Sequence, residues 1–318
     1  MAHLVESMAY ANDTPWHGLG NRISTKQPIE VWQREAGMNW SIEEAPVRFI
    51  AGSADTLGVI HSYPEQKVLY RSDTKSPLSV VSQRYQVVQP REVLEFYRDL
   101  TESSGFELET AGVLKGGKKV WALARTNQST TFKGNDVVNG YLLLATACDG
   151  TLATTAQFTS VRVVCNNTLA LSLTKGAGAI KVPHSTAFNP QAVKQQLGVT
   201  VGAWDSFIYR MKALSDRKVK SNEVEQFFMR VFSDPRNTAL GANDRAMKKA
   251  LAMFNGQGRG AELTSAKGTA FGLLSAVTEF VDHERRARST DHRLESAWFG
   301  GGAELKQKAV DQALLLVT

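Results

Sequence analysis

The segment from residue 105 to residue 168 constrains the fold more than any other part of the chain, because it reads as successive β-hairpins. Within residues 113–121, Gly116-Gly117 separates two runs of β-prone residues, and glycine accepts the positive φ that a tight turn requires. A second hairpin turns at Asp149-Gly150, a dipeptide that strongly favours short hairpin connections. The segment therefore predicts an antiparallel sheet, and its turns and faces carry cations instead of recognisable catalytic groups.

Hydrophobic periodicity divides the chain into three regions. Residues 1–47 are expected to be irregular apart from one short helix, which Pro28 begins and Gly37 ends. Residues 48–188 show strand patterns, interrupted by one helix that follows Pro90 and stops before Ser103. Residues 189–318 show helical patterns, so the predicted fold class is α+β: a β-hairpin-rich N-terminal part with an inserted helix, followed by a helical C-terminal part.

The helical part opens with a regular apolar stripe. Asn189-Pro190 is a good helix start, and the positions that follow it recur at intervals of three and four residues. The stripe predicts one long helix with a buried face formed by Val193, Leu197, Val201, Trp204, Ile208 and Met211. Further helices are expected over residues 222–232, 243–254, 267–288 and 303–316.

Composition indicates a folded protein of the cytoplasm. The 318 residues are 42% hydrophobic, which is enough to form a substantial core. The net charge of +6 permits attraction to polyanions. Without a signal peptide, Cys148 and Cys165 are expected to be free, buried thiols in a reducing compartment. No apolar run reaches the length of a membrane span, so no membrane partner is expected.

The motifs that would indicate an enzyme are incomplete. The glycine-rich residues 256–260 and the later Lys267-Gly268-Thr269 lack the spacing and the preceding strand of a phosphate-binding loop. No histidine or cysteine pair has the spacing of a metal site, and no serine lies in a nucleophile elbow. We therefore expect no cofactor, no metal and no catalytic constellation. Asp282-His283 is interpreted as the polar end of a helix, but it and His17 remain the alternative centre of a nucleic-acid enzyme.

Cations and aromatic residues are interleaved through the β-rich part. Binding of single-stranded nucleic acid requires cations along the backbone and aromatic side chains on which bases stack. The residues predicted to form such a site are Arg84, Tyr85, Lys115, Lys118, Lys119, Trp121, Arg125 and Arg162. The alternative for each cation is a solvated strand edge, where charge prevents aggregation.

Four motifs resemble a known family. They are TPWHGLG at residues 14–20, VSQRYQVVQP at 81–90, RVVCNNTL at 162–169 and GTAFGLLSAVTEFVDH at 268–283. Together they resemble the DUF932 family of phage- and plasmid-encoded proteins. The resemblance implies a mobile-element context in a bacterial host and implies little about mechanism.

The order of elements resembles a second group of proteins. An aromatic strand ending near Arg84-Tyr85, then a helix, then cationic hairpins is similar to the arrangement in Rad52-type single-strand annealing proteins. That resemblance implies a homo-oligomer that binds and anneals single-stranded DNA during recombination, without ATP. The alternative is a non-enzymatic protein that contacts an unknown host protein, for example to block a defence system.

Overall fold

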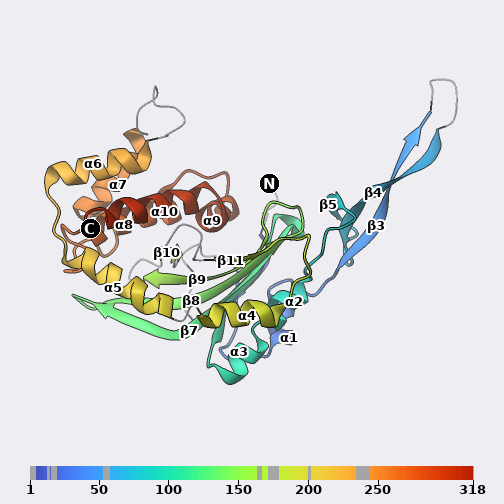
Figure 1. Ribbon diagram of the computed structural model, residues 1–318, viewed down its shortest axis with the longest axis horizontal. Helices are drawn as coiled ribbons and strands as arrows, with labels where there is room; N and C mark the ends of the chain where they lie inside the picture. The colour runs from blue at the N-terminus through green and yellow to red at the C-terminus, as the bar shows by residue number, and fades with distance from the viewer. Residues whose placement is uncertain are drawn as a thin grey trace.

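The computed structural model describes residues 5–12, 15, 20–52, 58–162, 167–170, 179–199, 202–233 and 244–317. In this part of the chain, a large sheet carries helices on both faces, a lobe of helices lies at one end, and a long hairpin projects from the other end (Figure 1). The architecture is α+β, with the sheets in the N-terminal half, which confirms the predicted fold class.

The large sheet has eight strands in the order β10-β9-β8-β7-β6-β1-β2, with β11 also paired to β9. The strands are β1 (Val5–Tyr10), β2 (Asn21–Arg22), β6 (Glu107–Leu114), β7 (Lys119–Phe132), β8 (Asp136–Ala147), β9 (Thr154–Arg162), β10 (Asn167–Ala170) and β11 (Ala179–Val182). Both predicted hairpins form. The first turns through Lys115–Gly117, where Gly116 and Gly117 have φ of 66° and 104°, and the second turns near Gly150, with φ of 74°.

The N-terminal region is not irregular, which corrects the expectation for residues 1–47. Strand β1 pairs antiparallel with β6, and β3 begins at Ile42. Met8 and Ala9 belong to the cores on opposite faces of the sheet. A strand that is buried on both faces has no polar alternation, so its periodicity did not reveal it.

The side chains of the central strands alternate between two cores. Ala122 and Leu142 lie on one face, and the helices that contribute to this core are α1 (Ile29–Glu35), α2 (Pro90–Glu95) and α4 (Pro190–Val199). Trp121 lies on the other face, where its ring meets Trp298 of α9 (Thr290–Phe299) edge to face at 4.8 Å. Both faces of the sheet are therefore covered.

The predicted inserted helix is two short helices. Helix α2 ends at Glu95, and α3 (Arg98–Ser103) begins after a turn at Phe96-Tyr97. The Tyr97 ring is fully buried, and its hydroxyl lies 2.9 Å from the carbonyl oxygens of Ala122 and Leu142. The break thus places a tyrosine in the sheet core with its polar atom paired.

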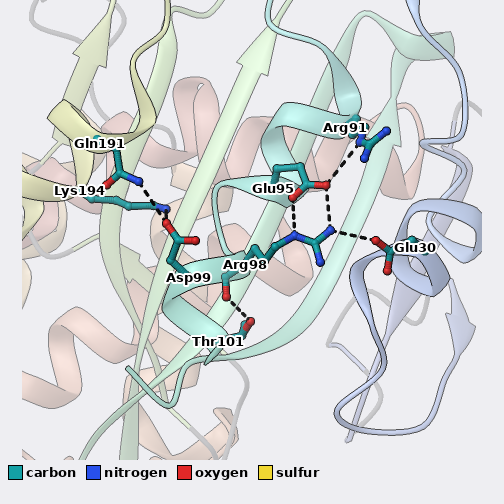
Figure 2. A network of polar contacts seen from close by, with 8 residues as sticks. All are labelled: Glu30, Arg91, Glu95, Arg98, Asp99, Thr101, Gln191 and Lys194. Atoms are coloured by element: carbon teal, nitrogen blue, oxygen red, sulfur yellow. Dashed lines mark hydrogen bonds and ion pairs between the residues drawn. The ribbon is translucent and has the colours of Figure 1, made fainter. Parts of the chain in front are cut away.

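Ion pairs tie the helices on this face to one another (Figure 2). Arg98 of α3 bonds Glu95 at 2.6 Å and Glu30 of α1 at 2.9 Å. Asp99 accepts a hydrogen bond from Lys194 of α4 at 2.9 Å. Exposed pairs of this kind contribute at most about 1 kcal/mol each, so the network fixes the orientation of the helices more than it stabilises them.

The C-terminal lobe packs on the end of the sheet that contains Phe132 and Val138. Its helices are α5 (Gly202–Asp216), α6 (Ser221–Phe232), α7 (Asp244–Ala252), α8 (Ala270–Glu279), α9 and α10 (Gly301–Leu314). The helix expected over residues 267–288 is shorter: α8 begins at Ala270 and passes into a π-turn, Phe280–Glu284. Helix α9 was not predicted.

The apolar stripe of residues 193–211 lies on two helices, so the prediction of one long helix is wrong. Val193 and Leu197 of α4 pack in the sheet core, whereas Trp204, Ile208 and Met211 of α5 pack in the helical lobe. The predicted burial is confirmed for these five residues, and Val201 lies outside the described residues. The sequence around this junction has low helix propensity, with Gly198 near the end of α4, Gly202 at the start of α5 and Thr200 in between.

The projecting hairpin belongs to a second sheet of β3 (Ile42–Ala51), β4 (Val59–Arg71) and β5 (Pro77–Ser82). Its base is anchored, because Ile42, Leu69 and Leu78 join the sheet core. At Pro46 the register shifts, so that Pro46 pairs with Lys67 while Val47 pairs with Tyr63. Beyond this bulge the two strands extend away from the body (Figure 1).

Replacing Trp204 with alanine should destabilise the protein by about 3–5 kcal/mol, because the ring is 7% exposed and packs between the sheet end and the helical lobe. Tyr209→Ala on the same helix is the control. Its side chain is 76% exposed, so we expect a change within about 0.5 kcal/mol. Urea unfolding followed by circular dichroism measures both, and equal midpoints for the two variants would contradict the packing.

Candidate nucleic-acid interface

The structure separates the predicted site residues along the strands. Lys119 pairs with Ala147 at the end of the sheet near the hairpin turns, whereas Arg125 pairs with Tyr141, six residues further along β7. Six residues of strand span about 20 Å. Arg162 pairs with Val138, still further from the turns. The eight residues therefore do not form one continuous site.

Three chain segments meet at the end of the sheet near the turns. The amide of Cys148 donates to the carbonyl of Lys118 at 2.9 Å, which joins the two hairpin turns. Ser79 donates to the carbonyl of Cys148 at 2.5 Å, and Tyr85 donates to the carbonyl of Ala147 at 2.6 Å. We call this region the turn end; it comprises residues 84–85, 115–119 and 147–150. It gathers five of the eight predicted residues: Arg84, Tyr85, Lys115, Lys118 and Lys119.

Two of the three lysines at the turn end share one carboxylate. Lys115 and Lys119 each place Nζ 2.6 Å from Oε1 of Glu295 on α9. The Lys119 side chain is only 6% exposed, and its ammonium group also lies 5.9 Å from the centre of the Phe299 ring. Lys119 therefore connects the sheet to α9, and we leave it out of the proposed surface.

The environment of Glu295 favours its charged form. Burial raises the pKa of this carboxyl, but the hydrogen bonds from Lys115 and Lys119 outweigh burial, and the pKa lies below its usual 4.5. A carboxyl whose pKa is depressed on folding contributes stability above pH 4.5, and that stability is lost as the pH falls through the folded-state pKa. The contact between sheet and α9 should therefore weaken in acid.

Arg84 and Lys118 are the cations at the turn end that remain available. Arg84 is exposed in the turn after β5, and Lys118 is half-exposed in the turn of the first hairpin. In the part of the chain that the structure describes, neither side chain forms an ion pair. These two residues come from separate segments that the hydrogen bonds of the turn end hold at the same end of the sheet.

Tyr85 offers less ring surface than predicted. Its ring stacks on His184 with centroids 4.4 Å apart, and its hydroxyl is held by Ala147. Burial raises the pKa of this phenol well above its usual 10. One ring face is already covered, so base stacking on Tyr85 is limited to the other face.

Arg162 and Trp121 are interior residues, which corrects their assignment to a surface. Arg162 is 6% exposed and holds Asp136 through Nε at 2.8 Å and a second guanidinium nitrogen at 2.7 Å. Ser265 donates to the same carboxylate at 2.6 Å. Trp121 is 1% exposed beneath α9. Arg125 is exposed, but it lies away from the turn end.

The residues considered for catalysis have structural partners. Asp282 is fully buried and lies 2.5 Å from Nζ of the buried Lys306. In the glycine-rich segment, the Arg259 amide donates to both oxygens of Glu279 at 3.0 Å, so the carboxylate occupies a position that a phosphate would need. His17 lies outside the described residues. Among the residues that the structure describes, no group of three or more His, Cys, Asp or Glu side chains could hold a metal ion.

Cys148 agrees with the prediction of a free thiol. It is buried and unbridged, and burial raises the pKa of its thiol to about 12, so it is not a reactive nucleophile. Cys165 lies outside the described residues.

The sequence reasoning missed the exposed aromatic residues of the projecting hairpin. Phe49 is 49% exposed and Tyr63 is 42% exposed, both beyond the bulge at Pro46. The hairpin base adjoins the turn end, because Gly117 packs against the Trp40 ring and the Gln83 amide donates to the carbonyl of Glu65 at 3.1 Å. The sequence signal that could have identified these residues is a pair of neighbouring strand patterns that carry apolar residues on both faces, with no helix pattern between them that could cover those faces.

Comparison with known proteins gives one match. The family model described as "Domain of unknown function (DUF932)" matches residues 77–298, from the first residue of β5 to α9. No curated protein and no solved structure matches, so the similarity to Rad52-type proteins stays a prediction. Within the described residues, no helix is long and apolar enough to cross a membrane.

Replacing Lys119 with methionine should destabilise the protein by about 3 kcal/mol, because the change removes one partner of a largely buried ion pair while Lys115 remains. Lys118→Met is the control, and its free energy of unfolding should change by no more than about 0.5 kcal/mol. Denaturant unfolding measures both. If Lys119→Met unfolds at the wild-type denaturant concentration, the structural role of Lys119 is wrong.

Proposed function

The chain belongs to the DUF932 family, whose description assigns no function, and we propose that it binds and anneals single-stranded DNA for a mobile element, without ATP. The observation that carries the proposal is the pair of available cations, Arg84 and Lys118, at the turn end. Their neighbours Lys115 and Lys119 are paired to Glu295, which leaves Arg84 and Lys118 as the two cations outside that ion pair, with Asp149 as the one carboxylate of the turn end itself. A strand of nucleic acid could be held there by its phosphates while its bases stay available for pairing.

The projecting hairpin also exposes the aromatic rings of Phe49 and Tyr63, but beyond the bulge at Pro46 it extends away from the cations of the turn end (Figure 1). We therefore propose the turn end alone as the surface that holds the strand. We propose further that the protein acts as a homo-oligomer in the cytoplasm of a bacterial host, as annealing of two bound strands would require more than one binding surface.

A second candidate function is contact with a host protein, without nucleic acid. The observation that favours it is the apolar character of the hairpin tip, where Ile50, Val59 and Ile60 are each more than half exposed. Exposed apolar patches of this kind are typical of protein interfaces. Binding to labelled oligonucleotide distinguishes the two candidates.

The double variant Arg84→Ala/Lys118→Ala should bind a labelled oligothymidine more weakly than the wild type. Each phosphate contact that is lost should reduce the log–log salt slope by roughly 0.7, so the double variant should lose about 1.4. Fluorescence anisotropy over a range of salt concentrations measures both quantities.

The matched control is Arg230→Ala/Lys248→Ala, which removes the same charge from exposed positions on α6 and α7. It should leave affinity and slope close to wild type. If both double variants lose affinity equally, the binding is a general effect of net charge and the turn end is not the site.

Annealing should proceed in the presence of a chelator and without ATP, because no metal cluster is found in the described residues and the glycine-rich segment is bound to Glu279. Mixing complementary oligonucleotides, one with a fluorophore and one with a quencher, measures the rate. The rate should exceed the protein-free control and fall steeply with salt. Strand binding without faster pairing would reduce the proposal to a binding protein, and no strand binding at low salt would favour the host-protein role.

A further inference from the structure

His184 connects three segments of the chain beside the turn end. It lies in the turn after β11, and its ring stacks on the Tyr85 ring with the planes 14° from parallel. Nδ1 lies 3.0 Å from the carbonyl oxygen of Gln86, and Nε2 lies 3.1 Å from the carbonyl oxygen of Leu152 in the second hairpin turn. The Gln86 amide donates in return to the carbonyl of His184 at 2.6 Å. One half-buried ring therefore joins residues 84–86 to the second hairpin.

The two polar contacts of this ring determine which protonation form fits. A carbonyl oxygen can accept a hydrogen bond but has no hydrogen to donate. A neutral imidazole carries a single N–H, so in that form one ring nitrogen would face a carbonyl oxygen with lone pairs on both atoms. The imidazolium carries an N–H on each nitrogen and satisfies both carbonyls at once. The two acceptors therefore assign the charged form to His184.

The other ionisable groups around the ring keep their charge near neutral pH. Those on the surrounding segments are Arg84, Tyr85, Lys118, Cys148, Asp149 and Lys181. Burial raises the pKa of the Tyr85 phenol well above 10 and that of the Cys148 thiol to about 12. Carboxylates, lysines and arginines ordinarily keep their charge between about pH 5 and pH 8, the range in which histidine changes its own. Among these residues, a change of pH in that range therefore acts through His184.

We propose that His184 is a proton-dependent clamp of the turn end and a third cation beside Arg84 and Lys118. As an imidazolium, it holds residues 84–86 against the second hairpin and adds one positive charge next to the surface that holds the strand. When the ring loses its proton, the charge and one of the two hydrogen bonds are lost together. The clamp requires no DNA, whereas its effect on strand binding rests on the proposed function.

The clamp should be complete in mild acid and should weaken as the pH rises. The folded protein favours the charged form of His184, so the contribution of the clamp is lost when rising pH removes the proton. The ion pairs of Glu295 change in the opposite direction and in a different range, because the pKa of that carboxyl lies below 4.5. Strand binding measured between about pH 6.5 and pH 8.5 therefore reports on the clamp and not on Glu295.

The first test needs no nucleic acid and uses the full chain with isotope-labelled histidine. In NMR spectra of the ring nitrogens at about pH 7, where a free histidine is mostly neutral, both nitrogens of His184 should give the signal of an N–H nitrogen. The variant His184→Gln assigns this signal by removing it. A ring nitrogen of His184 that carries no hydrogen at this pH would overturn the clamp.

The second test is the affinity for labelled oligothymidine at about pH 6.5 and pH 8.5, at constant ionic strength. The wild type should bind roughly threefold more weakly at the higher pH, which is the effect of losing one unit charge about 6 Å from a phosphate in water. His184→Gln is neutral at both values and should bind equally at both, with the wild-type affinity of the higher pH. His184→Arg keeps its charge and several N–H donors, so at the higher pH it should bind as the wild type does at the lower one.

The matched control is His292→Gln, which removes a half-buried histidine of α9 outside the turn end and should keep the wild-type pH dependence. Wild-type binding that is equal at the two pH values, or His184→Gln binding that keeps the wild-type pH dependence, would overturn the contribution of His184 to strand binding. A wild-type chain that binds no oligonucleotide at either pH would contradict the proposed function, and the NMR result would then decide the clamp alone.

Discussion

Burial of the central strands on both faces is the constraint on which the rest of the structure depends. In β7, Ala122 faces one core and Trp121 faces the other, so neither face can be left to solvent. The first face is covered by helices that come partly from the N-terminal half. The second face is covered in part by α9, so the chain leaves the helical lobe after α8 to cross this face of the sheet and then returns to the lobe with α10.

This crossing of the sheet also decides which cations are available. Helix α9 brings Glu295 beneath the first hairpin turn, where it pairs with Lys115 and Lys119. Lys118 lies in the hairpin turn, in a helical backbone conformation between the turn Lys115–Gly117 and the first residue of β7, and it forms no ion pair within the described residues. The packing of α9 on the sheet, and not the composition, therefore determines which cations remain outside the ion pair with Glu295. They are Lys118 and Arg84. A net charge of +6 says little about where a polyanion would bind.

The parts of the fold that could be predicted from sequence are those with a local signal. The two hairpins were predictable because Gly116-Gly117 and Asp149-Gly150 specify turns by their own backbone preferences. The buried strand β1 gave no alternation, and the stripe across α4 and α5 had helical spacing although its halves pack in different cores. Local periodicity reports that a residue is buried, but it does not report in which core.

The candidate site was harder to predict than the fold, because the partner of a charge is set by tertiary structure. Glu295 is 176 residues from Lys119 in the sequence. Asp136 of β8 pairs with Arg162 on the neighbouring strand β9. The sequence around a lysine beside a turn does not show whether its side chain will pair with a carboxylate or remain in solvent. Residues without such a partner can be identified only after the fold is known, and Arg84 and Lys118 are found in this way.

In the projecting hairpin, the sequence pattern can be interpreted only together with the fold. Strand patterns with apolar residues on both faces normally indicate a central strand, as in β8. In the projecting hairpin, at residues 47–51 and 59–63, the same pattern occurs on two strands that pair only with each other among the described residues. Ile50 and Ile60, which are each more than half exposed there, give the hairpin an apolar surface of the kind that is typical of contacts with other molecules. This distal part of the hairpin carries one formal charge, Arg48, whereas the turn end carries Arg84 and Lys118, so the two surfaces differ in the partners that they can attract.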